Sequence, residues 1–140
     1  MTLSVVINTK NAAETLERAL RSVSFADQIV VVDMYSDDET CAIAKNYTKD
    51  VHLHTDVGYV EPARNYAIQQ ASSEWILILD ADEVISESLA LTIQQIVRGL
   101  YSQEADCYYI ARKNFIFGEH IKHSGWWPDY ILRLFRKGAV

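Results

Sequence analysis

Four short apolar segments constrain the fold of this chain more than any other feature. Their apolar residues follow one another without alternating polar residues, which is typical of strands buried on both faces of a sheet. Segments with helical spacing separate them, and this order predicts an α/β architecture with a mainly parallel sheet. The four expected strands read LSVVIN, QIVVVD, VHLH and WILIL and cover residues 3–8, 28–33, 51–54 and 75–79.

Helices and further strands are expected in the remaining chain. Asn11 and Ser86 suit the N-terminal caps of the first and last helices. Pro62 suits a first helical turn, and Gly99 suits the end of the last helix. Beyond Gly99, aromatic residues roughly alternate with polar ones, which indicates antiparallel strands added to the sheet. The expected helices cover residues 11–23, 36–47, 61–71 and 86–100, and the antiparallel strands cover 107–117 and 130–135.

Composition narrows the class of protein. The chain has 140 residues, 49% of them hydrophobic, which fits one domain over residues 1–140 with a real core. The net charge of −6 argues against nucleic acid as a partner. Cys41 and Cys107 lie far apart, so we expect both to be reduced core residues of a cytoplasmic protein. Since no apolar run approaches the roughly 20 residues of a bilayer span, only peripheral membrane contact stays open.

Polar residues follow three of the expected strands at their carboxyl ends. The first strand runs into Thr9 and Asn11, the second into Asp33, and the fourth into Asp80 and Asp82. In an open α/β sheet, ligands bind in the crevice outside the carboxyl ends of the strands. These side chains are therefore expected to converge on one edge and form a ligand site.

The segment DAD, Asp80 to Asp82, predicts the chemistry of that site. Two carboxylates on one side of an extended segment repel each other unless a cation lies between them or one is protonated. Oxygen ligands favour Mg²⁺ or Mn²⁺, and Mg²⁺ often combines one or two carboxylates with substrate phosphates. The segment indicates a metal–diphosphate site, with a helix cap or a solvated acid cluster as the alternative. Glu83 is expected at the start of the next helix, where an acid suits the helix dipole.

The ordered set of motifs resembles the family 2 glycosyltransferases of the GT-A fold. The motifs are VVINTKNAAETLERALRSV, ADQIVVVDMYSDDETCAIAKNY, ARNYAI, WILILDADEVIS and HSGWWPDYILRLFRKG. They are most similar to the bacterial branch that adds sugars to the lipopolysaccharide core. The resemblance implies metal-dependent transfer of a sugar, with inversion, from a nucleoside diphosphate donor such as a UDP-sugar. The implied acceptor is a saccharide or glycolipid hydroxyl, in cell-envelope synthesis at the inner face of the cytoplasmic membrane.

The resemblance also implies roles for residues that contact the nucleotide. Thr9 and Asn11 match the polar end of the first strand, which borders the nucleotide in the family. Asp33 matches the acid that accepts a hydrogen bond from the base, usually uracil. Arg64, in ARN, matches a basic residue that lies along the nucleotide.

Three carboxylates match the metal and catalytic positions of the family. Asp80 and Asp82 match its Asp-x-Asp pair, the first nearer the ribose and the second on the Mn²⁺ or Mg²⁺ ion. Asp129, in WWPD, falls where a general base is expected. The chain departs from the family in Ala12 and Ala13, which replace two common acids.

Several assignments stay open between two readings. Arg133 and Arg136 either contact the diphosphate or are surface charges of a strand, and Trp126 and Trp127 either stack on a sugar or belong to the core or a lid. Family members usually continue past RLFR, so the chain is expected to be truncated at its C-terminal side. A non-catalytic nucleotide-sugar-binding module is therefore the alternative function. A dehalogenase-type phosphatase is disfavoured because its Asp-x-Asp pair follows the first strand.

Overall fold

The computed structural model describes residues 1–58, 60–102, 104–111, 115–117 and 130–139. Its centre is a six-stranded sheet in the order β3-β2-β1-β4-β8-β6, and β5 and β7 form a separate two-stranded sheet. The larger sheet contains β1 (Leu3–Thr9), β2 (Gln28–Asp33), β3 (Asp50–Leu53), β4 (Trp75–Asp80), β6 (Cys107–Ala111) and β8 (Tyr130–Arg136). The smaller contains β5 (Glu83–Ile85) and β7 (Phe115–Phe117), and the helices are α1 (Leu16–Ser22), α2 (Thr40–Lys45), α3 (Glu61–Gln70) and α4 (Glu87–Val97).

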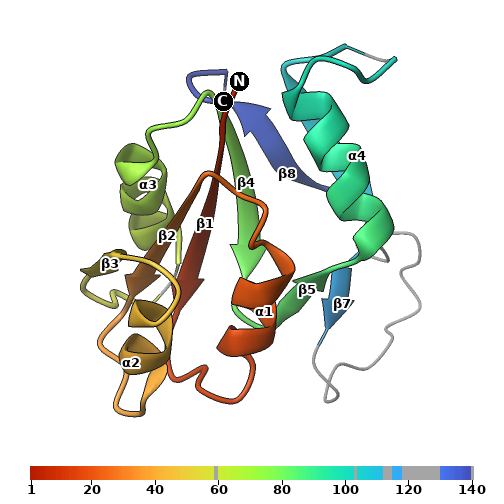
Figure 1. The fold of residues 1–140 in the computed structure, drawn as a ribbon. Coiled ribbons are helices and arrows are strands. Elements are labelled where there is room, and N and C mark those ends of the chain that lie inside the picture. Colours follow the sequence, from red (N-terminus) through yellow and green to blue (C-terminus); the bar gives the residue numbers. More distant parts are fainter. Residues whose placement is uncertain (59, 103, 112–114, 118–129, 140) are drawn as a thin grey trace.

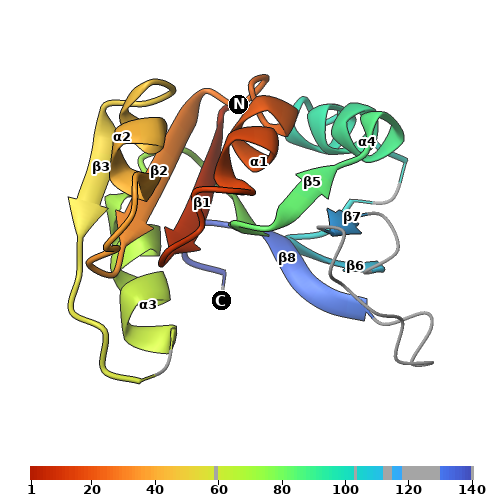
Figure 2. The same cartoon turned by 90° about the horizontal axis from the view of Figure 1, so that it is seen from below.

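The sheet is buried on both faces, as its apolar strands predict. Helices α1, α2 and α4 cover one face and α3 lies on the other (Figure 2). On the first face, Leu77 and Leu134 belong to a buried cluster with Leu20 and Ile93 of the helices. On the other face, small residues of α3, among them Ala67, contact a second cluster. In the described part of the chain, no helix has the length and apolar character needed to cross a bilayer.

The sheet combines parallel and antiparallel pairing. Strand β1 pairs in parallel with β2 and β4, and β2 pairs in parallel with β3. Strand β8 runs antiparallel to both β4 and β6, so its arrow opposes those of β1 and β4 in Figure 1. The expected parallel sheet with antiparallel C-terminal strands is therefore confirmed. Within the range 107–117, β6 joins this sheet as expected, whereas β7 belongs to the separate two-stranded sheet.

The helix ends agree with the sequence in part. Ser86 caps α4, because its side chain accepts a hydrogen bond from the Leu89 N–H. Gly99 follows α4 with φ +75°, a left-handed conformation that glycine adopts without strain. Asn11 does not cap α1, which begins at Leu16, and has φ +50° itself. Pro62 lies in the first turn of α3, as expected, while α2 begins later than expected, at Thr40.

The order of the strands creates a crevice beside β1. The chain places β2 and then β3 on one side of β1, and β4 on the other side. The carboxyl ends of β1 and β4 both lie at the bottom of Figure 1. Such a reversal of strand order leaves a crevice between the two strands, where open α/β sheets bind ligands. The fold thus places a binding position between the ends of β1 and β4.

Candidate functional site

The strand ends meet as the sequence predicts. In the β1–β2 pair Thr9 lies opposite Asp33, and in the β1–β4 pair Asn8 lies opposite Asp80. The polar ends of three strands therefore share one edge of the sheet. The expected convergence is confirmed for Thr9, Asp33 and Asp80.

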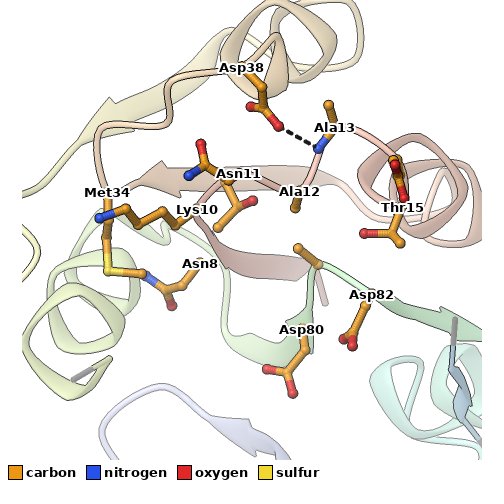
Figure 3. A pocket seen from close by; sticks show the side chains of 13 residues that line it. Asn8, Lys10, Asn11, Ala12, Ala13, Thr15, Met34, Asp38, Asp80 and Asp82 are labelled. Carbon is orange, nitrogen blue, oxygen red and sulfur yellow. Dashed lines mark hydrogen bonds between the residues drawn. The ribbon is translucent and has the colours of Figure 1, made fainter. Parts of the chain in front are cut away.

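A cleft of about 520 Å³ opens at this edge (Figure 3). Its walls come from the end of β1 and the turn into α1, the β2–α2 loop, and the β4–β5 turn. Of the described residues that line it, only Lys10 carries a positive charge, and its Nζ lies 2.7 Å from Asp56 Oδ2. The lining is otherwise acidic, with Glu14, Asp38, Asp80 and Asp82. A doubly charged anion in this cleft would meet repulsion unless a cation came with it.

Two buried polar atoms at the end of β1 have no hydrogen-bond partner among the described residues. They are Nδ2 of Asn8 and Oγ1 of Thr9, and Thr9 is only 2% exposed. Both residues line the cleft. A buried polar group without a partner costs about 1–3 kcal/mol, so these atoms suit a ligand that supplies the partner. The sequence places both residues at the polar end of the first strand, but a nucleotide contact was expected only for Thr9.

Asn11 joins the two loops above the cleft. Its N–H donates to Ser36 Oγ at 2.7 Å, and its side-chain oxygen accepts from the Asp37 N–H at 2.7 Å. Asp38 adds a second link, since its carboxylate accepts from the Ala13 N–H at 3.2 Å (Figure 3). Hydrogen bonding from Thr40 lowers the pKa of Asp38. Asp38 belongs to the polar residues that follow the second strand in the sequence, although no specific role was expected for it.

Asp33 is fully buried and is already hydrogen-bonded within the chain. Its Oδ2 accepts from the Ser36 N–H at 2.8 Å and its Oδ1 from the Ser36 hydroxyl at 2.5 Å. The adjacent Tyr35 has φ +57°, an uncommon conformation for a bulky residue, and is 59% exposed. The carboxylate therefore orders the turn after β2, and a base can reach it only if that turn shifts.

Asp80 lies between two guanidinium groups. Its Oδ1 lies 3.3 Å from Arg64 Nη2, and its Oδ2 lies 3.4 Å from Arg133 Nη2. Arg64 comes from α3 and Arg133 from β8, so three elements meet at this carboxylate. Asp82 follows in the β4–β5 turn and has no hydrogen bond or ion pair with any other described residue. In Figure 3 the Asp80 side chain projects from the end of β4 and the Asp82 side chain from the turn that follows, both at the edge of the cleft.

The expectation for Glu83 is wrong. It begins strand β5 instead of the next helix and is fully buried. Its carboxylate oxygens each lie 2.7 Å from a guanidinium nitrogen of Arg133, and Oε1 also accepts from the Asp80 N–H at 2.7 Å. Burial raises the pKa of Glu83 to about 7, although Arg133 opposes the rise. The sequence around Glu83 gives no sign of burial, because its partner Arg133 lies 50 residues away in the chain.

The two basic residues of β8 have different surroundings. Arg133 is 4% exposed and is paired with Glu83 and Asp80, so it is no surface charge. Arg136 lies at the other end of the strand, opposite Trp75 in the pairing with β4. It stacks over the Trp75 ring at 4.6 Å and forms ion pairs with Glu74 and Asp106. The proposed contact of Arg136 with a diphosphate is therefore wrong.

The donor set at the β4–β5 turn fits a divalent cation that also binds substrate oxygens. Carboxylate oxygens of Asp80 and Asp82 are the ligands that Mg²⁺ and Mn²⁺ prefer. The Asp80 carboxylate is already paired with two arginines, so the Asp82 carboxylate is the more available of the two for a cation. Among the described residues, no group of three or more His, Cys, Asp and Glu side chains could enclose a metal ion. Phosphate oxygens and water would have to complete the coordination.

Asp129 lies outside the described residues, as do Trp126 and Trp127. The expected general base and the expected sugar-stacking rings therefore stay predictions. Cys41 and Cys107 are both free and partly buried, and burial raises the pKa of the Cys41 thiol. Both thiols are thus less buried than the expected core residues, and their reduced state stays a prediction.

Comparison with known proteins gives a consistent result. The family model described as Glycosyl transferase family 2 matches residues 4–138. An uncharacterized glycosyltransferase of Rickettsia bellii is 38% identical over 107 residues, which are 76% of this chain and 35% of that protein. The chain thus spans about a third of the length of the curated relatives that it matches.

Solved structures share the fold. TarS of S. aureus, crystallised with UDP, is 29% identical with a TM-score of 0.57, over 70% of this chain and 32% of that chain. Glucosyl-3-phosphoglycerate synthase from Mycobacterium tuberculosis, crystallised with Mn²⁺ and UDP-glucose, is 22% identical with a TM-score of 0.59. That match covers 74% of this chain and 40% of the synthase chain. These likenesses, with the mixed sheet and flanking helices, confirm the GT-A fold.

Proposed function

Since this chain belongs to glycosyltransferase family 2, we propose that its cleft binds a UDP-sugar and that the protein transfers the sugar to an acceptor hydroxyl. One observation supports this most directly. The unpartnered polar atoms of Asn8 and Thr9 lie beside the carboxylates of Asp80 and Asp82 at the reversal of strand order. Hydrogen-bond donors next to cation ligands suit a nucleoside diphosphate. TarS, crystallised with UDP and with UDP-GlcNAc, supports the choice of uridine.

Different residues of the cleft bind different parts of the donor. Asn8 Nδ2 and Thr9 Oγ1 donate hydrogen bonds to its ribose or phosphate oxygens. Asn11 holds the loops above the cleft through Ser36 and Asp37. Arg64, partly exposed beside Asp80, lies along the nucleotide and offsets phosphate charge.

In this proposal the end of β2 selects the base of the nucleotide. Asp33 accepts a hydrogen bond from the N3–H of uracil after the Ser36 turn shifts. Its two carboxylate oxygens have lone pairs beyond those that Ser36 uses. The exposed Tyr35, held with positive φ beside this turn, is consistent with a segment that adjusts on binding.

Asp80 and Asp82 would hold the metal ion, with Asp80 nearer the ribose. When bound, Mn²⁺ or Mg²⁺ neutralises the negative charge that develops on the diphosphate as the glycosidic bond breaks. Arg64 and Arg133 hold the Asp80 carboxylate in place from two sides. Asp129 takes the proton of the acceptor hydroxyl, which attacks the anomeric carbon from the face opposite the diphosphate and inverts it.

The physiological setting is proposed from the resemblance of HSGWWPDYILRLFRKG to lipopolysaccharide core transferases. In this setting the acceptor is a saccharide or glycolipid of the cell envelope, and the protein works in the cytoplasm or at the inner membrane face. The domain proposed for residues 1–140 then supplies the donor-binding part of a longer transferase, in keeping with the coverage of its relatives.

Calorimetry tests the donor site. UDP binding is measured with Mn²⁺ and with EDTA for the wild type, for Asp82→Asn and for Asp106→Asn. Asp106 is an exposed acid far from the cleft and serves as the matched control. We expect Mn²⁺ to increase UDP affinity for the wild type and the control, and to have little effect on Asp82→Asn. Equal wild-type affinity in Mn²⁺ and EDTA would refute the metal–diphosphate site.

A transfer assay separates an enzyme from a binding module. UDP release from UDP-GlcNAc or UDP-glucose is followed with Mn²⁺, with and without saccharide acceptors. We expect acceptor-dependent UDP release. Tight donor binding without turnover under all conditions would favour the non-catalytic module.

A further inference from the structure

Within the described part of the chain, the polar contacts of the buried Glu83 carboxylate lie at or beside Asp80. Oε1 accepts from the backbone N–H of Asp80 at 2.7 Å, directly at the end of β4. Both oxygens also pair with Arg133, each at 2.7 Å. The carboxylate is therefore attached on one side to the backbone of Asp80 and on the other to β8.

Arg133 contacts the same strand end at two further points. Its Nη1 donates to the Ile78 carbonyl at 3.1 Å, two residues before Asp80. Its Nη2 lies 3.4 Å from the Asp80 carboxylate. Together, Glu83 and Arg133 contact the backbone and the side chain of Asp80 and the backbone of Ile78. A short segment at the rim of the cleft is thus fixed from two directions.

The energetics point to positioning as the reason for this arrangement. Desolvation of two buried charges offsets much of their attraction, so a buried ion pair is weak evidence for stability. An apolar pair of similar volume would fill the space between β5 and β8 as well. It could not accept the Asp80 N–H or hold the Asp80 carboxylate.

We propose that Glu83 and Arg133 are positioning residues, which hold Asp80 and the turn to Asp82 in the geometry that binds the metal–diphosphate group. This inference rests on the proposed function. Neither residue needs to touch the donor. Strand β8, which joins the sheet 50 residues after Glu83, thereby sets the shape of the donor site.

The test compares folding with metal-dependent binding in one set of variants. The double variant Glu83→Leu/Arg133→Met replaces the ion pair by apolar side chains. We measure its melting temperature and its UDP affinity by calorimetry with Mn²⁺ and with EDTA. We also follow free Mn²⁺ by electron paramagnetic resonance in the presence of UDP. Arg136→Met, on the same strand but at its far end, is the matched control.

A positioning role predicts a selective loss. The double variant should fold, and its UDP affinity in EDTA should match the wild type. The gain in affinity that Mn²⁺ gives the wild type should fall about 10–100-fold, the usual effect of residues that orient metal ligands. Arg136→Met should keep the full gain. A folded double variant with the full Mn²⁺ gain would overturn the inference.

Single variants keep the inference testable if the double variant does not fold. Arg133→Lys retains the charge but cannot form the two parallel bonds to Glu83. We expect it to retain only part of the Mn²⁺ gain, and full retention would overturn the inference. If the UDP affinity of the wild type does not depend on Mn²⁺, the proposed function is overturned, and this inference with it.

Discussion

Removing Arg133 should destabilise the protein in a way that depends on pH. The variant Arg133→Met leaves Glu83 fully buried without its cation. Breaking a buried ion pair by removing one partner costs about 3–5 kcal/mol, far more than losing an exposed pair. In a domain of this size, such a loss corresponds to a melting temperature lower by about 10–20 °C.

The pH dependence follows from the pKa of Glu83. Burial raises this pKa from 4.5 to about 7, so the native state binds the proton more readily than the unfolded state. The contribution of Glu83 to the unfolding free energy is therefore greatest below pH 4.5, falls as the pH rises, and levels off above pH 7 in the wild type. Without Arg133, which lowers the pKa, the native pKa lies higher and the loss continues above pH 7.

The difference in unfolding free energy between the wild type and Arg133→Met should accordingly be constant from pH 5 to 6 and grow above pH 7. Its steepest slope is about 1.4 kcal/mol per pH unit. Urea unfolding at pH 5, 6, 7, 8 and 9 measures it, with Arg136→Met as the control. Among the described residues, the Arg136 side chain makes exposed ion pairs, one ring contact and a weak contact with Met1 Sδ, so the loss of stability on its removal should be small and independent of pH. Parallel curves for the two variants would refute the buried pairing of Glu83.

Three further predictions concern the base, the acceptor and the fold. Asp33→Ala should weaken UDP binding and remove the preference for UDP over other nucleoside diphosphates, and a calorimetric series that finds unchanged selectivity would place the base elsewhere. In the full-length protein, Asp129→Asn should leave UDP-sugar affinity unchanged and reduce transfer by about 10²–10⁴-fold in a kinetic assay; near-normal transfer would exclude it as the base. Ser86→Ala should lower the unfolding free energy by about 1 kcal/mol through loss of the α4 cap, whereas the exposed Ser88→Ala should change it little in urea unfolding.

The parallel part of the fold was predictable because its signals are local. Consecutive β-branched residues, as in β1 and β2, suit strands that are covered on both faces, and the structure buries them. The cap at Ser86 and the left-handed Gly99 are equally local. The meeting of Thr9, Asp33 and Asp80 followed from topology alone, since parallel strands end at the same edge.

The features that escaped prediction depend on contacts distant in sequence. Strand β5 has only three residues, and its pairing with β7 has no local sequence signal. The partner of Glu83 lies on β8, so nothing near DADE distinguishes a buried acid from a solvated one. Arg133 and Arg136 are both arginines and lie three positions apart in the sequence. Only the pairing register places Arg133 near the cleft and Arg136 at the far end of the strand.

The position of β8 has a consequence for biosynthesis. Translation makes β8 after every other described strand, but in the sheet it lies between β4 and β6. A nascent chain that has emerged only through α4 leaves the edge of β4 uncovered and Glu83 without Arg133. Such an uncovered edge invites association with other chains, which makes this stage of folding vulnerable to aggregation. The last of the described strands to be translated is thus the one that carries Arg133, and a chain released before β8 lacks the contacts of Arg133 with Asp80 and Glu83 at the cleft.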